Sequence, residues 1–234
     1  MTYHSRGMDM EIYNLDSIEF MKNMEECSID LIVTDPPYKT ITGGRNNGRN
    51  SKRPKGILNE NNGLFEHQQL EISVWITLLY KVLKEGSHCY IMTNTLNMEE
   101  MLTESRKAGF KLHNILVWEK NNCTPSQYYM KNCEYVLFLR KGKAKWINNI
   151  GTSKTVHKFN NIIGKKTHPC EKPVELLEFY IGNSIKDKDS EVVFDPFMGT
   201  GSCGIACRKL GIKNFIGIEI DKEYFDIAVN RLGV

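Results

Sequence analysis

An apolar run that ends in an acid, two prolines and an aromatic residue is the feature of this sequence best suited to chemistry. Residues 30–38 pass from a Leu-Ile-Val stretch into Asp35-Pro36-Pro37-Tyr38. Each proline fixes its φ near about −65° and has no N–H, so the turn is stiff and its carbonyls are left as acceptors. The Asp35 carboxylate and the Pro36 carbonyl can then face one amino group, while Tyr38 offers a flat surface for a planar base.

Such a corner suits a nitrogen nucleophile whose lone pair is delocalised into an aromatic ring. Two acceptors that hold both hydrogens of an –NH2 group would turn that lone pair toward an electrophilic carbon, and the rate gain would come from positioning. No covalent enzyme intermediate is required. The alternative is a Pro-Pro strand terminator in which Asp35 caps a helix or lies on the surface.

A glycine-bearing turn near the C-terminal end is the second chemical feature. Gly199 and Gly201 allow close backbone approach to a ligand, and Thr200 and Ser202 can cap the helix that follows, whose free N–H groups favour a carboxylate or a phosphate. Eighteen residues after Gly201, Glu219 ends the next strand and can accept both hydroxyls of a ribose. The pairing predicts a nucleoside-bearing cofactor.

The motif alone leaves the identity of that cofactor open. The loop has no Gly-Lys-Ser/Thr ending of a phosphate loop, although Gly199 to Gly204 formally match Gly-x-Gly-x-x-Gly. Asp195 and Pro196 precede the loop and suit a ligand geometry other than that of a nicotinamide dinucleotide. A purely structural turn, with Glu219 as a solvated strand end, is the other interpretation.

Apolar runs and breakers predict the elements that must position these residues. Unbroken apolar runs indicate strands covered on both faces: Met10–Tyr13, Ile29–Val33, His88–Thr93, Leu112–Trp118, Tyr135–Leu139, Val192–Phe194 and Phe215–Ile218. Helical patterns separate them: Ser17–Met24, His67–Lys84, Met98–Lys107, Val174–Ser184, Cys203–Leu210 and Glu223–Arg231. Gly109 and Gly211 stand where helix C-caps are expected.

The alternation of strands and helices predicts an α/β fold with a mostly parallel, seven-stranded sheet and helices on both faces. Residues 112–139 hold two strands and no helix, so we expect an antiparallel hairpin there. In such sheets ligands gather at the carboxyl ends of the strands. Both chemical motifs should therefore lie at one edge of the sheet.

Composition indicates a single globular domain over residues 1–234. The chain is 41% hydrophobic and 25% charged, no run reaches the roughly 20 apolar residues of a membrane helix, and the polar N-terminus lacks a secretory signal. We therefore expect a cytoplasmic enzyme with no membrane association. Seven cysteines without a Cys-x-x-Cys pair argue against a disulfide framework and a metal site, and we interpret Cys203 and Cys207 as buried small hydrophobes.

The net charge of +3 hides two cationic segments. Residues 39–58 contain six Lys or Arg and residues 140–170 contain eight, and neither segment contains an acid. Acid-free basic segments of this kind favour a polyanion partner, and the stretch 40–62, rich in Gly and Asn, is typical of a mobile loop. The candidate phosphate contacts are Lys39, Arg45, Arg49, Lys52, Arg53 and Lys143.

Taken together, these motifs resemble the amino-methyltransferases of DNA, in the subgroup where the catalytic motif precedes the cofactor motif. The matching segments are Asp35–Tyr38, Phe194–Gly201, Gly217–Glu219, His168–Pro173, Trp118–Lys120 and Cys133–Lys141. The resemblance spans the chain from about Ile12 to Arg231. It implies a methyltransferase fold, S-adenosylmethionine as donor, and a target nucleotide flipped out of double-stranded DNA.

The resemblance also implies roles for individual residues. Asp35, Pro36, Pro37 and Tyr38 would bind the target base. The cofactor would contact Asp35, Lys172, Phe194, Asp195, Pro196, Phe197, Gly199, Thr200, Gly201, Ser202, Glu219 and Ile220. Asp16 would meet the cofactor's adenine, although Leu15 replaces the family's usual glycine and a helix N-cap role for Asp16 competes. His168 is either part of the site or a structural imidazole.

Adenine N6 is favoured as the methyl acceptor because an Asp at the first motif position is commoner in adenine enzymes, whereas cytosine-N4 enzymes often carry Ser. Methylation of RNA or of a protein amide, a non-catalytic nucleic-acid-binding protein and a nicotinamide-dependent oxidoreductase are the competing hypotheses. Only the loop 39–66 and the segment 142–166 are available for DNA recognition. A short target site, a homodimer sharing the DNA, or weak specificity would accommodate that. We expect a bacterial or phage source, association with the nucleoid through DNA, and a cognate restriction endonuclease as a candidate partner.

Overall fold

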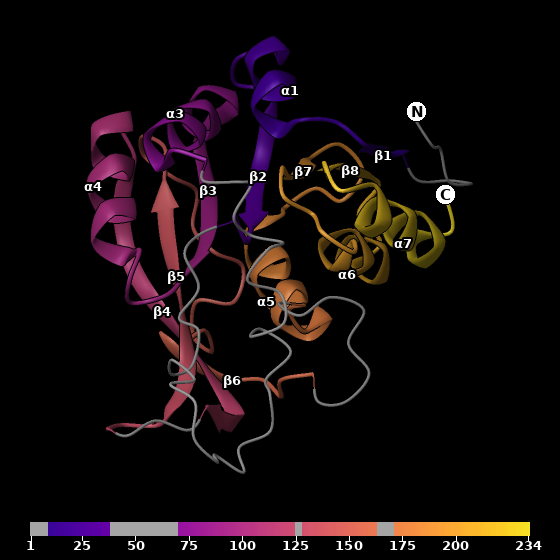
Figure 1. Cartoon of the computed structure of the whole chain (residues 1–234). Helices are drawn as coiled ribbons and strands as arrows, with labels where there is room; N and C mark the ends of the chain where they lie inside the picture. The colour runs from indigo at the N-terminus through magenta and orange to yellow at the C-terminus, as the bar shows by residue number, and fades with distance from the viewer. Residues whose placement is uncertain (1–8, 38–69, 125–127, 163–170) are drawn as a thin grey trace, which may run out of the picture.

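The computed structural model describes residues 9–37, 70–124, 128–162 and 171–234. Within these ranges the chain forms one mixed sheet whose strands lie in the order β1-β8-β7-β2-β3-β5-β4-β6 (Figure 1). The strands are β1 (Asp9–Tyr13), β2 (Ile29–Thr34), β3 (Leu83–Thr93), β4 (Lys111–Thr124), β5 (Lys131–Arg140), β6 (Val156–Lys158), β7 (Val192–Asp195) and β8 (Asn214–Ile218).

The strands that carry both motifs are parallel neighbours at the middle of the sheet. β1, β8, β7, β2 and β3 pair in parallel, and β7 lies directly beside β2 with Leu31 opposite Val193 and Ile32 opposite Phe194. Because parallel strands end at the same edge, the segments that leave β2 and β7 emerge side by side. This is the edge at which the sequence predicts ligand binding.

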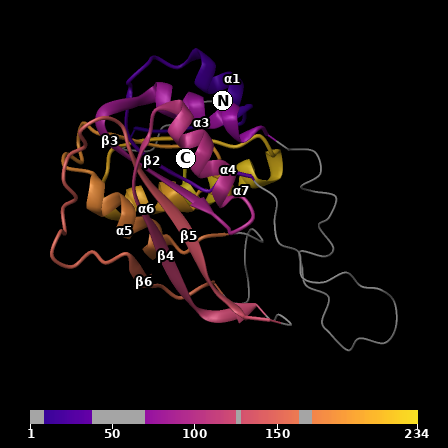
Figure 2. The same cartoon turned by 90° about the vertical axis from the view of Figure 1, so that its left-hand side faces the viewer.

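The other part of the sheet is largely antiparallel. β5 pairs antiparallel with β3 and with β4, so β4 and β5 form the expected hairpin, and the short β6 adds in parallel to the outer side of β4. The residue pair Trp118 and Glu134 faces across this hairpin. In the turned view of Figure 2 the hairpin extends away from the helices.

Helices cover both faces of the sheet (Figures 1 and 2). They are α1 (Ser17–Asn23), α3 (Ile72–Val82), α4 (Met98–Ala108), α5 (Val174–Ser184), α6 (Ser202–Leu210) and α7 (Lys222–Leu232). One core cluster joins α1, α3 and α4 to the sheet around Trp75, and a second joins α5, α6 and α7 to it around Tyr180 and Phe215. Burial of these apolar side chains is the main force that holds the helices on the sheet.

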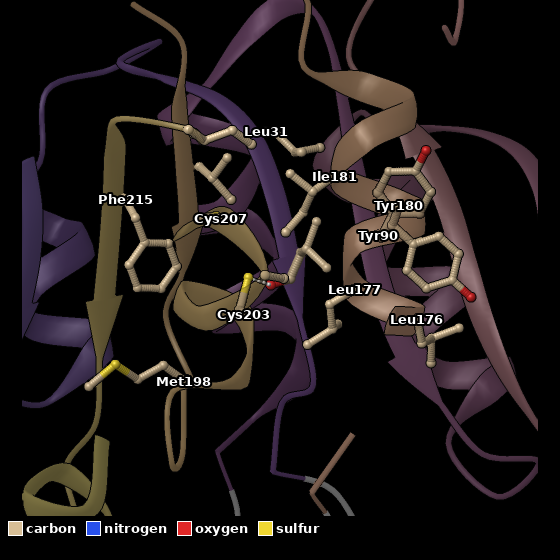
Figure 3. Close-up of a cluster of buried hydrophobic side chains, with 14 of the residues drawn as sticks. Leu31, Tyr90, Leu176, Leu177, Tyr180, Ile181, Met198, Cys203, Cys207 and Phe215 are labelled. Carbon is tan, nitrogen blue, oxygen red and sulfur yellow. Dashed lines mark hydrogen bonds between the residues drawn. The ribbon is translucent and has the colours of Figure 1, made fainter. Parts of the chain in front are cut away.

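The second cluster explains why α6 can approach the sheet closely (Figure 3). Cys203 and Cys207 are buried among apolar side chains, as expected, and the Cys203 thiol lies 3.7 Å from the Val33 carbonyl oxygen. At Gly204 an added Cβ would lie 2.9 Å from the Phe215 ring. Glycine is therefore needed at that position for α6 to pack on β8.

All seven expected strands and the hairpin are present, but several boundaries were wrong. β4 runs beyond the expected Trp118 to Thr124, and β5 begins at Lys131 instead of Tyr135. The helix expected over 67–84 begins at Ile72 and ends at Val82, whereas residues 67–69 lie outside the described ranges. β3 already begins at Leu83, which pairs with Ile29. The register then shifts, so that residues 84–87 form an irregularity within β3 and do not continue the helix. β6 was also missed, because three residues give no periodicity, and it raises the strand count of the described sheet from seven to eight.

Gly109 and Gly211 adopt positive φ at the C-caps of α4 and α6, as expected. In the described part of the chain, no helix combines the length and apolar character that a bilayer crossing demands.

Candidate functional site

The proline corner, which starts at Asp35, begins where β2 ends. Asp35 follows Thr34 directly, Pro36 is buried and Pro37 is half-buried, so the proline turn packs against the protein body. The Asp35 carboxylate forms an ion pair with the ammonium group of Lys172, a buried residue that precedes α5. Tyr38 lies outside the described residues.

A hydrogen bond joins this corner to the base of the glycine turn. The Thr34 hydroxyl donates to Asp195 Oδ1 at 2.8 Å, and the Phe197 N–H donates to the same oxygen at 3.2 Å. Asp195 ends β7 and is buried. Residues 34 and 195 are thus fixed against each other, and the proline corner and the glycine turn form one site.

Backbone hydrogen bonds hold the glycine turn in place. Gly199 and Gly201 have φ of +52° and +83°, a region that favours glycine. The Met198 N–H donates to the Ile218 carbonyl at 2.9 Å, and the Gly199 N–H donates to Glu219 Oε2 at 3.0 Å. The other oxygen of Glu219 accepts from the Asp221 N–H at 2.8 Å. Each carboxylate oxygen keeps a further lone pair for a ligand.

The glycine turn also has unfilled capacity to bind. The Ser202 hydroxyl, at the first turn of α6, is buried and has no hydrogen-bond partner among the described residues. A Cβ added at Gly199 would meet no described atom within 4 Å, so the turn borders open space there. A buried hydroxyl without a partner is costly, which indicates that a ligand or water satisfies it.

The electrostatics of this site favour a cation. Burial raises the pKa of Asp195 to about 7, against the opposing hydrogen bonds from Thr34 and Phe197, and the negative charges of Asp35 and Glu219 raise it further. Burial likewise raises the pKa of Glu219 above its ordinary value. Carboxylates that repel one another bind a positively charged ligand more readily than a pyrophosphate. Within the described ranges, no group of three or more His, Cys, Asp or Glu side chains is arranged to hold a metal ion.

Known proteins are similar to this chain in sequence and in fold. The family described as DNA methylase, with N6 and N4 members, matches residues 29–230. This chain belongs to that family. The type II methyltransferase M2.DpnII of Streptococcus pneumoniae is 30% identical over 245 residues, which cover 95% of this chain and 89% of that protein. The type II methyltransferase M.HinfI of Haemophilus influenzae is also 30% identical, over 93% of this chain and 66% of its own length.

Solved structures of methyltransferases give the same result for the fold. The crystal structure of the M1.HpyAVI-SAM complex is 27% identical, covers 95% of this chain and 100% of its own, and has a TM-score of 0.69. The PvuII DNA methyltransferase, which is described as cytosine-N4-specific, has a TM-score of 0.70 at 17% identity and covers 95% of this chain and 86% of its own. At that identity the likeness concerns the fold alone.

In this methylase, Asp16 performs the competing role of a helix cap. Its side chain accepts from the Glu19 N–H at 3.0 Å and caps α1. The next residue, Ser17, donates its hydroxyl to the Pro196 carbonyl, so the start of α1 is tied to the glycine-turn segment. Asp16 is therefore close to the site in the fold, while its side chain is engaged in capping.

The remaining expected cofactor residues divide into core and surface positions. The Phe194 side chain is fully buried in the core on the α1–α3 face, so it can line a ligand site only through its backbone. Phe197 is half-buried and packs edge-on against Trp75, with ring centroids 6.0 Å apart. Ile220 is 45% exposed beside Glu219 and offers an apolar surface at the strand end. Thr200 accepts two hydrogen bonds from the Arg231 guanidinium, at 2.9 and 2.7 Å.

The one predicted phosphate contact that falls within the described ranges lies away from the corner. Lys143 follows the end of β5, where Arg140 pairs with His88 near the start of β3. It therefore lies at the edge of the sheet opposite Asp35, and its role as a phosphate contact stays a prediction. The other five, Lys39, Arg45, Arg49, Lys52 and Arg53, and also His168, lie outside the described residues.

The sequence interpretation missed the charged side chains that surround Lys172. Glu134 Oε2 lies 3.6 Å from the Lys172 ammonium, and Glu134 Oε1 accepts from Lys120 at 3.0 Å. Glu171 pairs with Arg231 at 2.7 Å. The segments Trp118–Lys120 and Cys133–Lys141 carry part of the family resemblance, but only the pairing of β4 with β5 brings Lys120 and Glu134 together.

Proposed function

We propose that this methylase transfers a methyl group from S-adenosylmethionine to the exocyclic N6 of adenine in a flipped-out nucleotide of double-stranded DNA. The observation that carries the proposal is the hydrogen bond from Thr34 to Asp195. It puts the proline corner and the glycine turn in one site, as a direct transfer between a base and a cofactor requires. Membership of the DNA methylase family supports the reaction class.

The chain's own residues fit this cofactor. S-adenosylmethionine supplies an electrophilic methyl group on a sulfonium cation. A positively charged ligand suits the neighbourhood of Asp35, Asp195 and Glu219, whose mutual repulsion it would relieve. The buried Ser202 hydroxyl and the N-terminal amides of α6 suit a carboxylate, and the open space at Gly199 admits close approach. M1.HpyAVI was solved as a complex with SAM, which agrees with this assignment.

Further contacts follow from the positions of the strand ends. Glu219 retains acceptor capacity for ribose hydroxyls, and the exposed Ile220 beside it suits the edge of an adenine ring. The nearby Asp16 has its side chain committed to α1, so any contribution to the adenine pocket would use its remaining carboxylate oxygen. These residues would hold the cofactor, and its methyl group would be supplied beside the proline corner.

At the corner, Asp35 and the Pro36 carbonyl would accept the two hydrogens of the base amino group. This directs the nitrogen lone pair toward the methyl group and keeps water from the nucleophile. Asp35 would then take the proton that the methylated nitrogen releases. Lys172 sits against the Asp35 carboxylate and fixes its orientation. Tyr38 would stack on the base.

The DNA side of the proposal rests on the basic segments. The loop 39–66 follows the proline corner in the sequence and is rich in basic residues. The segment 142–166 contains β6, which pairs with β4 of the hairpin. We propose both as recognition elements. The relatives M2.DpnII and M.HinfI are named as type II methyltransferases, so a role beside a restriction endonuclease is proposed for this chain as well.

A direct assay tests the proposal. The protein is incubated with labelled S-adenosylmethionine and unmodified duplex DNA, the DNA is digested to nucleosides, and the labelled nucleoside is identified. We expect the label in N6-methyldeoxyadenosine. Label in N4-methylcytosine would overturn the choice of base, and label in RNA or protein but not DNA would overturn the substrate.

A further inference from the structure

Four side chains of alternating charge run from the catalytic corner into the hairpin. They are Asp35, Lys172, Glu134 and Lys120, and they come from four separate segments: the end of β2, the approach to α5, β5 and β4. The two lysine side chains are about nine-tenths buried, at 9% exposed for Lys172 and 10% for Lys120. The proposed reaction uses only the first member directly. Lys172 orients Asp35, whereas Glu134 and Lys120 need a separate explanation.

Glu134 contacts both lysines at once. Its Oε1 accepts from Lys120 at 3.0 Å and its Oε2 lies 3.6 Å from the Lys172 ammonium. Burial would raise the pKa of the Glu134 carboxyl, but the positive charges of Lys172 and Lys120 outweigh burial and hold it below the ordinary value. Glu134 is therefore negatively charged at neutral pH, and the Lys172 ammonium lies between two carboxylates.

The hairpin fixes Glu134 from the other side. Glu134 is opposite Trp118 in the strand register, and Trp118 is buried with its indole N–H donating to the Phe159 carbonyl at 2.8 Å. The Lys120 ammonium lies 5.7 Å from the centre of the Trp118 ring. Backbone pairing thus fixes the position of Glu134 on β5 and Lys120 holds its carboxylate, whereas Lys172, on a flexible four-carbon stem, has many rotamers of its own.

We propose that Glu134 is a positioning residue that holds the Lys172 ammonium against the Asp35 carboxylate, with Lys120 balancing its charge. The proposal rests on the function proposed above, because it assigns Glu134 a part in methyl transfer. Lys172 donates to Asp35 Oδ2, and this ion pair sets which way the carboxylate faces the base amino group. Without Glu134, the ammonium can leave Asp35, and the carboxylate then rotates between orientations, of which few face the base.

The chain offers a matched control. Glu119 is the neighbour of Lys120 on β4 and pairs with the exposed Lys158 at 3.3 Å. It is as exposed as Glu134, at 33% against 31%, and carries the same charge, but its ion pair is with β6 instead of with the corner. Glu134→Gln and Glu119→Gln are therefore equal changes of shape and charge in the same hairpin. Glu134→Asp keeps the charge on a shorter side chain.

Two measurements test the proposal. In the cofactor-free protein labelled with ¹⁵N-lysine, the ammonium signal that Lys172→Met removes should be visible in the wild type and in Glu119→Gln, should vanish in Glu134→Gln and should return in part in Glu134→Asp. In single-turnover methylation, Glu134→Gln should lower the rate about tenfold with the KM for the cofactor within twofold. Glu119→Gln should keep the wild-type rate within twofold.

The outcomes separate this proposal from the proposed function. An unchanged ammonium signal and an unchanged rate in Glu134→Gln would overturn it, as would an equal loss in Glu119→Gln. If the wild-type protein methylates no DNA, the proposed function fails, and loss of the ammonium signal in Glu134→Gln alone would still establish that Glu134 positions Lys172.

Discussion

The glycine turn and the proline corner lie against each other but are held by different forces. The turn is fixed by backbone N–H groups that donate to Ile218 and Glu219, and by glycines whose conformation other residues rarely adopt. The corner is fixed by ion pairs with charged side chains of other segments: Lys172, just before α5, and, through Lys172, Glu134 on the hairpin. The glycine turn, the proposed cofactor half of the site, is therefore held by backbone hydrogen bonds to the neighbouring strand end, whereas the proline corner, the proposed catalytic half, also depends on ion pairs from remote segments.

The largest effect should follow from removing the acceptor at the corner. Asp35→Ala should lower the methylation rate by about a thousandfold, because the base amino group loses an oriented acceptor. Cofactor affinity, measured by calorimetry, should change less than threefold, since the glycine turn is held by its own backbone. Full activity in this variant would show that Asp35 is not the acceptor for the base amino group, and the contrast between the two regions would fail.

Two glycine substitutions sharpen the contrast within the cofactor half. At Gly201 an added Cβ would lie 3.2 Å from Ala228 and 3.3 Å from Leu232, so Gly201→Ala should lower the free energy of unfolding by about 2–3 kcal/mol. At Gly199 the Cβ would enter open space. Gly199→Ala should lower it by about 1 kcal/mol, the strain of its positive φ, yet reduce cofactor affinity roughly tenfold.

Urea unfolding and calorimetry on the two proteins measure both quantities. Equal losses of stability, or intact cofactor binding in Gly199→Ala, would contradict the assignment of that open space to the ligand.

The stability of the protein should depend on pH because of Asp195, the buried carboxylate between the two regions. A folded-state pKa of about 7 for Asp195 lies above the unfolded value, so its contribution to stability is present at low pH and is lost as pH rises through 7. Between pH 5 and 7.5 the wild type should lose about 2 kcal/mol relative to Asp195→Asn, which has no such titration. Urea unfolding of both proteins across this range is the measurement, and parallel curves would refute the shift.

The smallest effect should come from the basic residues that follow the proline corner in the sequence. Replacing Arg45, Arg49 and Arg53 by Gln should reduce the slope of log affinity against log salt by roughly 0.9 for each DNA phosphate that is no longer neutralised. Lys213→Gln is the control, because Lys213 directly precedes β8, at the edge of the sheet opposite Asp35, lies in neither proposed recognition element and should leave the slope unchanged. Filter binding over a salt series separates the two, and an unaltered slope in the triple variant would exclude these arginines from phosphate binding.

The contrast between the regions also explains what could be predicted from the sequence. The strands, the hairpin and both motifs are contiguous, so patterns such as Asp35–Tyr38 and Gly199–Gly201 indicate them directly. The partners of Lys172 are remote: Glu134 and Lys120 meet it only through strand register, which no local pattern contains. The edge of the sheet at which Lys143 lies also follows from the direction of β5, which the local run of basic residues does not indicate.

One contact reaches across the division. The Arg231 guanidinium on α7 bonds Thr200 in the glycine turn and pairs with Glu171, the neighbour of Lys172. The Arg231 guanidinium thus links the glycine turn to the segment that carries Lys172. If cofactor binding tightens base binding through this link by some factor, base binding must tighten cofactor binding by the same factor.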